Sequence, residues 1–400
     1  MAYLPLANIL HHKLRSVLSA LGIGIGIAML ITLSGLARGS LYEIADRWES
    51  VDAELIMFPR GWGGQASIKS GAGLWDSYEQ YVMETFADDV EEVAPVFTWP
   101  MELAGQDQNV AAIKAEDWQT FTGGKKVIAG RLFQPDPEKF TRLMKDKAAA
   151  SPEGIAEVDQ QMLQAANMLE LVIDTRLARA GGFEVGQTVR AANHDWKIVG
   201  IVPAGVMARV FMPRRTAQVL FGSGSKQSTL MFIRLRDGRD LHKVARRIRS
   251  ETGQDAVPLT EYRGMLVAKF EMMFQYVNMV NIVALSIAFL FIMVTLHTMV
   301  LQRTREIAIL KSCGASWWFI LKQVMAESVL LTMIGLIVGI GLSFLAAWAI
   351  AAFQPLLTVT ITMEWLGIAL VASVLGALLS AVYPAYRAIR VDMVAALSYE

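Results

Sequence analysis

The chain has 400 residues, of which 54% are hydrophobic and 18% are charged, whereas about 25% of the residues in an ordinary soluble domain are charged. Its 37 basic and 37 acidic residues cancel, so no overall positive field exists to attract nucleic acid. The single cysteine, Cys313, excludes an internal disulfide, and the five histidines lack metal-ligand spacing. The composition therefore indicates a membrane protein and argues against a nucleic-acid partner, a disulfide scaffold and a zinc module.

Four stretches carry no charged residue and are long enough to cross a bilayer, which takes about 20 apolar helical residues. They are residues 16–37, 272–302, 328–363 and 365–386. Gln354 and Pro355 interrupt the third stretch, so its helix is expected to end near Phe353. The first is longer than the roughly 7–15 apolar residues of a signal peptide, so we interpret it as a retained anchor. We predict transmembrane helices at residues 16–38, 272–302, 323–353 and 365–386.

Basic residues near the ends of these helices indicate their orientation, because cytoplasmic loops are enriched in Lys and Arg. Lys13 and Arg15 precede the first helix, and Arg387 and Arg390 follow the fourth. The segment between the second and third helices is also rich in basic residues. We therefore expect residues 1–15, 303–322 and 387–400 to be cytoplasmic, and residues 39–271 and 354–364 to lie outside.

The outer region, residues 39–271, has a soluble composition and short apolar runs that are typical of strands. Predicted strands are 53–58, 90–96, 110–114, 169–173, 197–202, 210–212 and 230–235, and predicted helices are 77–90, with Ser77 as N-cap, and 241–250. Residues 135–167 are expected to form an inserted pair of helices, broken at Ser151 and Pro152. The predicted fold is thus an α-helical membrane protein with four transmembrane helices and a large extracytoplasmic α+β domain, in two lobes, between helices 1 and 2.

The segment 265–313 contains neither glycine nor proline, so nothing in it lowers helix propensity sharply. At about 1.5 Å per residue, a helix of this length would reach about 70 Å, of which only about 30 Å can lie in hydrocarbon. The sequence therefore favours one stiff helix that joins the outer region to the cytoplasmic face. The alternative is a break at a membrane boundary without glycine or proline.

The sequence contains no recognisable enzyme motif. The segment 222–226 lacks the spacing of a phosphate-binding loop and is interpreted as a turn. Gly22, Gly24 and Gly26 lie inside a predicted span, where small residues allow helices to approach closely. We therefore predict a non-catalytic chain that binds no cofactor and no metal.

Polar residues inside the predicted spans are few. Two faces have the small-xxx-small spacing that suits helix pairing, within a subunit or across a dimer: Gly335 with Gly339, and Gly376 with Ser380. Among the ionisable residues, Glu327 is expected to make a polar contact to a neighbouring helix rather than to transfer a proton. The role of His297 stays open.

The basic segment 303–322 is expected to be helical, with a turn at Gly314 and with Ser316 as the N-cap of the next helix. Arg303 and Arg305 fit two interpretations. They anchor the membrane orientation, or they belong to a docking surface for a cytosolic motor.

Three separated segments carry a recognisable pattern. They are RTREIAILKSCGAS at 303–316, YPAYRAIRVD at 383–392 with AALSYE at 395–400, and KLRSVLSALGI at 13–23. They resemble the coupling segment, the ending and the opening of the FtsX/MacB-type family of ABC transporter permeases. The outer region resembles that family's extracytoplasmic domain more loosely, at 130–133, 185–189 and 197–202. The insertion 135–167 and Cys313 depart from the family pattern, so no role follows for them.

The resemblance implies a four-helix permease in the bacterial inner membrane, paired with a second copy or a paralogue and surrounded by membrane lipids. Family members with a fused ATPase carry it ahead of the first helix, where this sequence has 15 residues, so a separate ATPase subunit that binds ATP and Mg is expected. The resemblance assigns the docking of that subunit to Arg303, Arg305, Glu306, Lys311, Gly314, Ala315 and Ser316. It assigns flanking contacts with the ATPase to Lys13, Arg15, Arg387 and Arg390.

Three functions are compatible with this family. The first is export or extraction of a lipid, lipoprotein, peptide or drug. In this function, ATP-driven motion of the long helices moves the outer domain, a mechanism called mechanotransmission. A periplasmic adaptor or a substrate-binding protein is then a further partner. The second is a regulatory scaffold that activates a periplasmic cell-wall hydrolase. The third is a receptor for an extracellular peptide. The size of the outer region favours transport.

Overall fold

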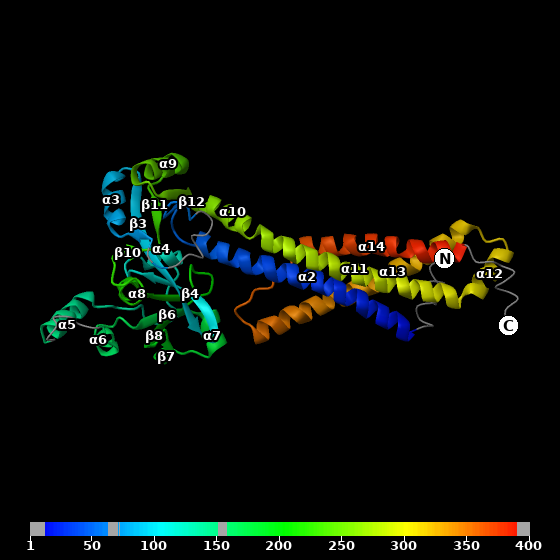
Figure 1. Ribbon diagram of the computed structural model, residues 1–400, viewed down its shortest axis with the longest axis horizontal. Helices are drawn as coiled ribbons and strands as arrows, with labels where there is room; N and C mark the ends of the chain where they lie inside the picture. The colour runs from blue at the N-terminus through cyan, green and yellow to red at the C-terminus, as the bar shows by residue number, and fades with distance from the viewer. Residues whose placement is uncertain (1–12, 63–70, 72, 151–157, 390–400) are drawn as a thin grey trace. The chain divides into compact units, whose positions relative to one another are not determined.

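The computed structural model describes residues 13–62, 71, 73–150 and 158–389. The chain divides into two units, Met1–Ser40 with Met272–Glu400, and Leu41–Glu271. The first unit is helical and the second, the outer domain, contains the strands (Figure 1). The predicted fold class, a four-helix membrane protein with an α+β domain between helices 1 and 2, is therefore confirmed.

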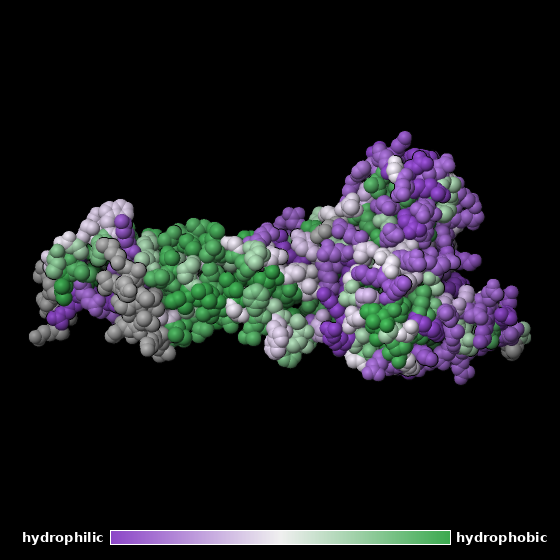
Figure 2. Space-filling view, turned by 180° about the vertical axis from the view of Figure 1, so that it is seen from behind, coloured by the Kyte–Doolittle hydropathy of each residue, from purple (hydrophilic) through white to green (hydrophobic). Residues whose placement is uncertain are grey.

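Within the described residues, four helices are long and apolar enough to cross a membrane. They are α2 (Lys13–Glu49), α11 (Glu271–Gln302), α13 (Trp317–Phe353) and α14 (Met363–Ile389). Figure 2 shows a hydrophobic surface over the helical unit and a largely hydrophilic surface over the outer domain. The helices extend beyond the predicted spans, most of all α2, which continues to Glu49 instead of ending at residue 38.

The single helix expected over the glycine- and proline-free segment is wrong. Phe270 and Arg303 are not helical, and they separate α10 (Leu259–Lys269), α11 and α12 (Thr304–Ser312). The N–H of Phe270 donates to the Val267 carbonyl oxygen at 3.0 Å, a tight turn that ends α10. Helix propensities differ by less than about 1 kcal/mol among these residues, whereas α10 buries Tyr262 and Leu266 to 1% exposure. Packing therefore decides where the helix breaks.

Glycines on α13 set how closely it packs against α2. A Cβ at Gly335 would lie 2.6 Å from Cγ2 of Ile23, and a Cβ at Gly339 would lie 2.8 Å from the carbonyl oxygen of Gly24. Any side chain at these positions would force the two helices apart. This small-residue face therefore pairs helices inside one chain.

The second small-residue face, on α14, is also used within the chain. A Cβ at Gly376 would collide with the ring of Phe289 on α11, and Ser380 is buried. Next to it, the Ser328 hydroxyl of α13 donates to the Ala377 carbonyl oxygen at 2.8 Å. The sequence left open whether these faces act within a subunit or across a dimer, and the contacts made here are internal.

The outer domain is built on a sheet with strand order β12-β1-β11-β3-β4-β9-β6-β8-β5, and β7 pairs with β8. The strands are β1 (Leu55–Phe58), β3 (Val90–Leu103), β4 (Gln106–Ile113), β5 (Ala129–Gly130), β6 (Glu170–Asp174), β7 (Thr188–Ala191), β8 (His194–Val202), β9 (Val210–Pro213), β11 (Leu230–Leu235) and β12 (Asp255–Pro258). A separate ribbon joins β2 (Leu74–Trp75) to β10 (Gln227–Ser228). The sequence missed β2, β5, β7, β10 and β12, which have two to four residues each and too little periodicity to recognise.

The long strand β3 joins the two lobes of this domain. Its first half, residues 90–96, pairs with β11, and its second half, residues 97–103, pairs with β4. Beyond β4 the sheet is mixed, since β4 runs parallel to β9 and β6 runs parallel to β8. The carboxyl ends of β4 and β9 therefore meet at one edge.

Helices α3 (Ser77–Thr85) and α9 (Leu241–Thr252) cover the lobe formed by β12, β1, β11 and the first half of β3 (Figure 1). The predicted N-cap Ser77 is wrong, because Asp76 occupies that position, and α3 ends at Thr85 since β3 begins at Val90. The remaining helices are α4 (Trp118–Thr122), α7 (Thr175–Gly181), α8 (Arg214–Leu220) and, in the insertion, α5 (Pro137–Ala150) and α6 (Gln160–Ala165). The predicted break at 151–152 lies outside the described residues.

Two glycines on α13 provide a matched test of the helix packing. Gly339→Ala should lower the unfolding free energy by about 1–3 kcal/mol, because overpacking displaces the α2 backbone. Gly341→Ala should cause no loss, since a Cβ there meets nothing within 4 Å. Thermal unfolding of the purified full chain measures both, and equal midpoints would contradict the packing described here.

Candidate functional site

The short helix α12 carries most of the predicted docking residues and is largely exposed. Ala308 is its one residue that is fully buried, which fixes the orientation of the helix. Arg305 and Glu306 are exposed beside Ile309 and Leu310, which are 47% and 43% exposed. α12 therefore presents a face on which two charges adjoin two aliphatic side chains.

Arg303 and Lys311 are placed differently from these exposed residues. The Arg303 side chain is 20% exposed, and its Nε lies 3.8 Å from Oε2 of Glu306. Lys311 Nζ donates to the Ile389 carbonyl oxygen at 2.9 Å, near the end of α14. Since a cation near the last carbonyls of a helix satisfies them, Lys311 stabilises the junction of α12 with α14.

The turn after α12 follows the predicted pattern. Gly314 has φ +88°, in the left-handed region that glycine adopts without strain, and Ala315 follows it. The Ser316 hydroxyl oxygen accepts the N–H of Phe319 at 3.3 Å, so Ser316 is the N-cap of α13 as expected. Trp317 and Trp318 are about half exposed, as suits side chains in a lipid headgroup layer.

The predicted flanking residues are described only in part. Arg387 is exposed, and its Nε donates to the Tyr383 hydroxyl at 3.4 Å. Arg390 lies outside the described residues, and the side chains of Lys13 and Arg15, at the start of α2, are likewise not described.

A small cavity of about 90 Å³ between α11, α12 and α13 is lined by Arg303, Glu306 and Glu327, among others. Glu327 is 6% exposed, and its Oε1 makes no hydrogen bond within the described residues. The expected polar contact of Glu327 is thus absent at this oxygen. His297 lies with its ring centre 5.5 Å from that of Tyr383.

The two helical connections of the outer domain enter one core. Trp48, in the last turn of α2, lies with its ring centre 5.5 Å from that of Tyr262 on α10 and 5.6 Å from that of Phe232 on β11. These residues belong to a single buried cluster with β1. Sequence reasoning missed this cluster because helix 1 was expected to end at residue 38.

A charge network also holds the end of α2. Oε1 of Glu43 contacts the guanidinium groups of Arg47 at 2.6 Å, Arg176 at 3.0 Å and Arg209 at 3.2 Å. Arg47 also reaches Oδ2 of Asp174 at 3.4 Å, a fully buried carboxylate that caps α7. Burial raises the pKa of Asp174, and the neighbouring backbone and guanidinium groups oppose the rise. The network thus joins α2 to the carboxyl end of β6.

A cavity of about 690 Å³ in the outer domain lies at the shared carboxyl edge of β4 and β9. We call it the outer cleft. It is lined by Asp76, Ile113, Lys114, Ala115, Glu116, Phe133, Gln134, Pro135, Pro137, Pro213, Arg214, Arg215, Gln218 and Lys226. Pro135 and Pro137 belong to the insertion, which therefore supplies part of one wall. Pockets at the carboxyl ends of parallel strands are common ligand sites.

Beside the outer cleft, Asp117 is 6% exposed and its Oδ2 makes no hydrogen bond within the described residues. Burial raises the pKa of Asp117 to about 7, while the charges of Lys114 and Arg214 oppose the rise and those of Glu79 and Glu116 add to it. Asp117 is thus partly protonated at neutral pH.

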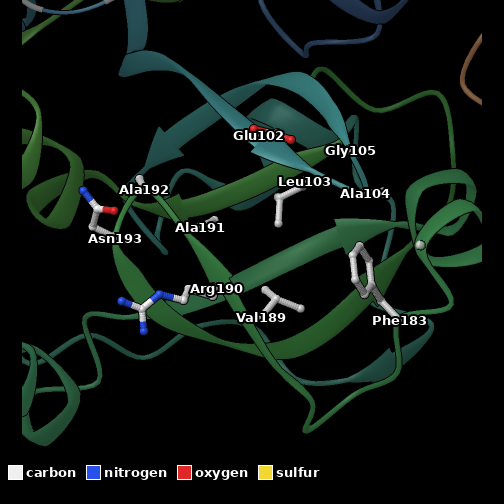
Figure 3. Close-up of a pocket in the computed structure, with 11 residues that line it drawn as sticks. Glu102, Leu103, Ala104, Gly105, Phe183, Val189, Arg190, Ala191, Ala192 and Asn193 are labelled. Carbon is white, nitrogen blue, oxygen red and sulfur yellow. The ribbon is translucent and has the colours of Figure 1, made fainter.

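A second cavity, of about 560 Å³, lies between the β3–β4 and β7–β8 turns. Figure 3 shows Leu103, Phe183 and Val189 around the cavity, whereas the guanidinium group of Arg190 extends away from them. No group of three or more His, Cys, Asp or Glu residues in the described ranges could hold a metal ion.

Comparison with known proteins assigns the chain to a family. The MacB-like periplasmic core domain matches residues 16–251, and the FtsX-like permease C-terminal domain matches residues 278–393. The chain belongs to the FtsX/MacB-type family of ABC transporter permeases. It is therefore a multi-pass membrane permease subunit.

Curated relatives agree with this assignment. The chain is 26% identical over 426 residues to the macrolide export ATP-binding/permease protein MacB of Chlorobium luteolum, covering 98% of the chain and 59% of the relative. It is 22% identical to the probable syringafactin export protein SyfD of Pseudomonas syringae pv. tomato, covering 100% of the chain and 58% of the relative. It is also 22% identical to the pyoverdine export protein PvdT of Pseudomonas fluorescens, covering 97% of the chain and 58% of the relative. The chain thus spans about three-fifths of the length of these relatives.

Among solved structures, the periplasmic region of MacB from Actinobacillus actinomycetemcomitans is similar at 13% identity, with a TM-score of 0.36, covering 54% of this chain and 94% of that chain. The extracellular domain of the transporter YknZ from Gram-positive bacteria is similar at 14% identity, with a TM-score of 0.33, covering 52% and 98%.

The raised pKa of Asp117 predicts a pH dependence of stability. Because the folded state holds this proton up to about pH 7 while an ordinary Asp loses it near 3.8, the unfolding free energy should fall as pH rises between these values, by up to about 4 kcal/mol. Asp117→Asn should remove that part of the fall.

Thermal unfolding of the purified full chain between pH 5 and pH 8 measures the effect. Asp237→Asn, an exposed carboxylate of the same domain, is the control and should keep the original profile. The same profile for Asp117→Asn and the unmodified chain would show that Asp117 titrates normally.

Proposed function

We propose that the chain is the membrane subunit of a bacterial inner-membrane ABC exporter, with cytoplasmic termini, and that α12 docks on a separate ATPase subunit that binds ATP and Mg. The observation that carries this proposal is the exposed face of Arg305, Glu306, Ile309 and Leu310 on a helix fixed from behind by Ala308. Protein interfaces combine apolar contact with a polar rim in this way. The family assignment supports the same reading.

The route to the outer domain supports transmission of motion. α2 is one helix from Lys13 to Glu49, and its last turn is held by the Glu43 network and the Trp48 cluster. The other connection is α10, which buries Tyr262 in the same cluster. We propose that ATP-driven movement of α2 and α11 displaces this core, so that work is done outside the membrane while the chain itself stays non-catalytic.

The relatives named for macrolide, syringafactin and pyoverdine export support an exporter of lipid, lipoprotein, peptide or drug. The proposed complex contains a second copy or a paralogue of this chain and a periplasmic adaptor or substrate-binding protein.

Charge reversal on α12 tests docking. Arg305→Glu combined with Ile309→Asp should weaken binding of the co-expressed ABC ATPase by roughly tenfold or more, because interface affinity is concentrated in a few central residues. Arg179→Glu, at an exposed cation of the outer domain, should leave binding unchanged. Co-purification from membranes measures both. Unchanged recovery of the ATPase with the α12 variant would contradict the docking assignment.

Lengthening the junction at Phe270 tests transmission. Inserting Gly-Ser-Gly after Phe270 should preserve ATP hydrolysis but reduce the ATP-dependent change in hydrogen exchange of α10 and β12 to the part that reaches them through α2, because a flexible link transmits little displacement. The same insertion after Gly238, in an exposed turn, should preserve both. An undiminished exchange response in the Phe270 variant would exclude transmission through α10.

A further inference from the structure

The outer cleft combines an apolar wall with a charged one. Pro135 and Pro137 supply the accessible part of the apolar side, and Ile113, Phe133 and Pro213, which also line the cleft, are buried. Its volume of about 690 Å³ lies within the roughly 300–1,000 Å³ that is typical of small-molecule sites. The cleft is therefore large enough for a drug-sized molecule with an apolar body.

The cations of the charged wall are unequally neutralised. Lys114 contacts Glu79 and Glu116 at 2.5 and 3.3 Å, so its charge is compensated within the protein. Arg215 reaches only neutral oxygens, those of Gln218 and Gly224, at 3.4 and 3.3 Å. Lys226 is exposed, and neither it nor Arg215 pairs with a carboxylate among the residues that the structure describes. The cleft thus retains two uncompensated positive charges.

Arg214 forms the buried part of this wall and retains a free donor. It is 9% exposed, and its Nη2 lies 3.7 Å from Asp76 and 3.5 Å from Glu79. Its Nη1 makes no hydrogen bond to any described residue. A buried guanidinium with an unsatisfied N–H is costly and is matched in geometry to a carboxylate. Because Asp117 is partly protonated, its negative charge neutralises the nearby Arg214 guanidinium only in part.

We propose that the outer cleft binds an anionic amphiphile, a drug-sized molecule with an apolar body and a carboxylate. Arg215 and Lys226 receive the carboxylate beside the buried guanidinium of Arg214, and Pro135 and Pro137 receive the apolar body. The insertion then has a role, since Pro135 and Pro137 form part of the apolar wall. This binding requires no ATPase and goes beyond the transport function proposed above.

The test uses the purified full chain in lipid nanodiscs and three fluorescent probes that share a dansyl body and a six-carbon arm. 6-(Dansylamino)hexanoate carries the carboxylate, and the matched compounds end in an ammonium or a hydroxyl. Fluorescence anisotropy, corrected with empty nanodiscs, gives the affinities. The carboxylate should bind saturably and at least about tenfold more tightly than either matched compound. Equal affinities, or no saturable binding of the carboxylate, would overturn the proposal.

Variants locate the site. Arg215→Ala with Lys226→Ala should weaken carboxylate binding about tenfold or more, whereas Arg179→Ala with Lys197→Ala, an equal loss of exposed charge elsewhere in the domain, should change it less than about twofold. Lys226→Glu alone, at an exposed position, should also weaken binding and guards against misfolding of the double variant. Undiminished binding in both cleft variants would overturn the assignment. Co-purification of the ATPase should be unaffected by all of them, so a failure here is separate from a failure of the docking proposal.

Discussion

The contact between Trp48 and Tyr262 is the constraint on which the outer domain depends. The polypeptide enters this domain through α2 and leaves it through α10. Both helices place an aromatic ring in one core, with ring centres 5.5 Å apart. Because protein interiors are close-packed, neither helix can move at this point without displacing the strands beside it. The fold therefore couples both connections to the sheet through one packed core.

Packing in the helical unit follows a different rule, because lipid tails provide no hydrophobic drive for helices to associate. Glycines let α2 and α13 approach, with Gly24 opposite Gly335 and Gly339. Hydrogen bonds add to this contact, since Asn281 of α11 donates to the Ser34 hydroxyl of α2 at 2.8 Å. α2 is thus held on two sides, by close backbone contact with one helix and by polar contact with another.

The outer cleft shows how the domain tolerates buried charge. Arg214 and Lys114 are balanced by Asp76, Glu79 and Glu116, while burial keeps Asp117 partly neutral at pH 7. A buried charge is stable only when it is paired or neutralised. The charge of Arg214 follows that rule, but its Nη1 lacks a hydrogen-bond partner within the described residues, and unsatisfied buried groups of this kind concentrate at functional sites.

Hydropathy in the sequence determined the four membrane helices, because a bilayer accepts only long apolar stretches with satisfied backbones. Gln354 and Pro355 determined the end of the third at Phe353. Local chemistry likewise determined the N-cap at Ser316. The break at Phe270 and the placement of Lys311 against Ile389 depended on tertiary contacts that outweigh weak local propensities. Asp117 and Arg214 are brought together only because the parallel strands β4 and β9 end at one edge. Strand pairing joins residues far apart in the chain, and no local pattern records which strands will meet.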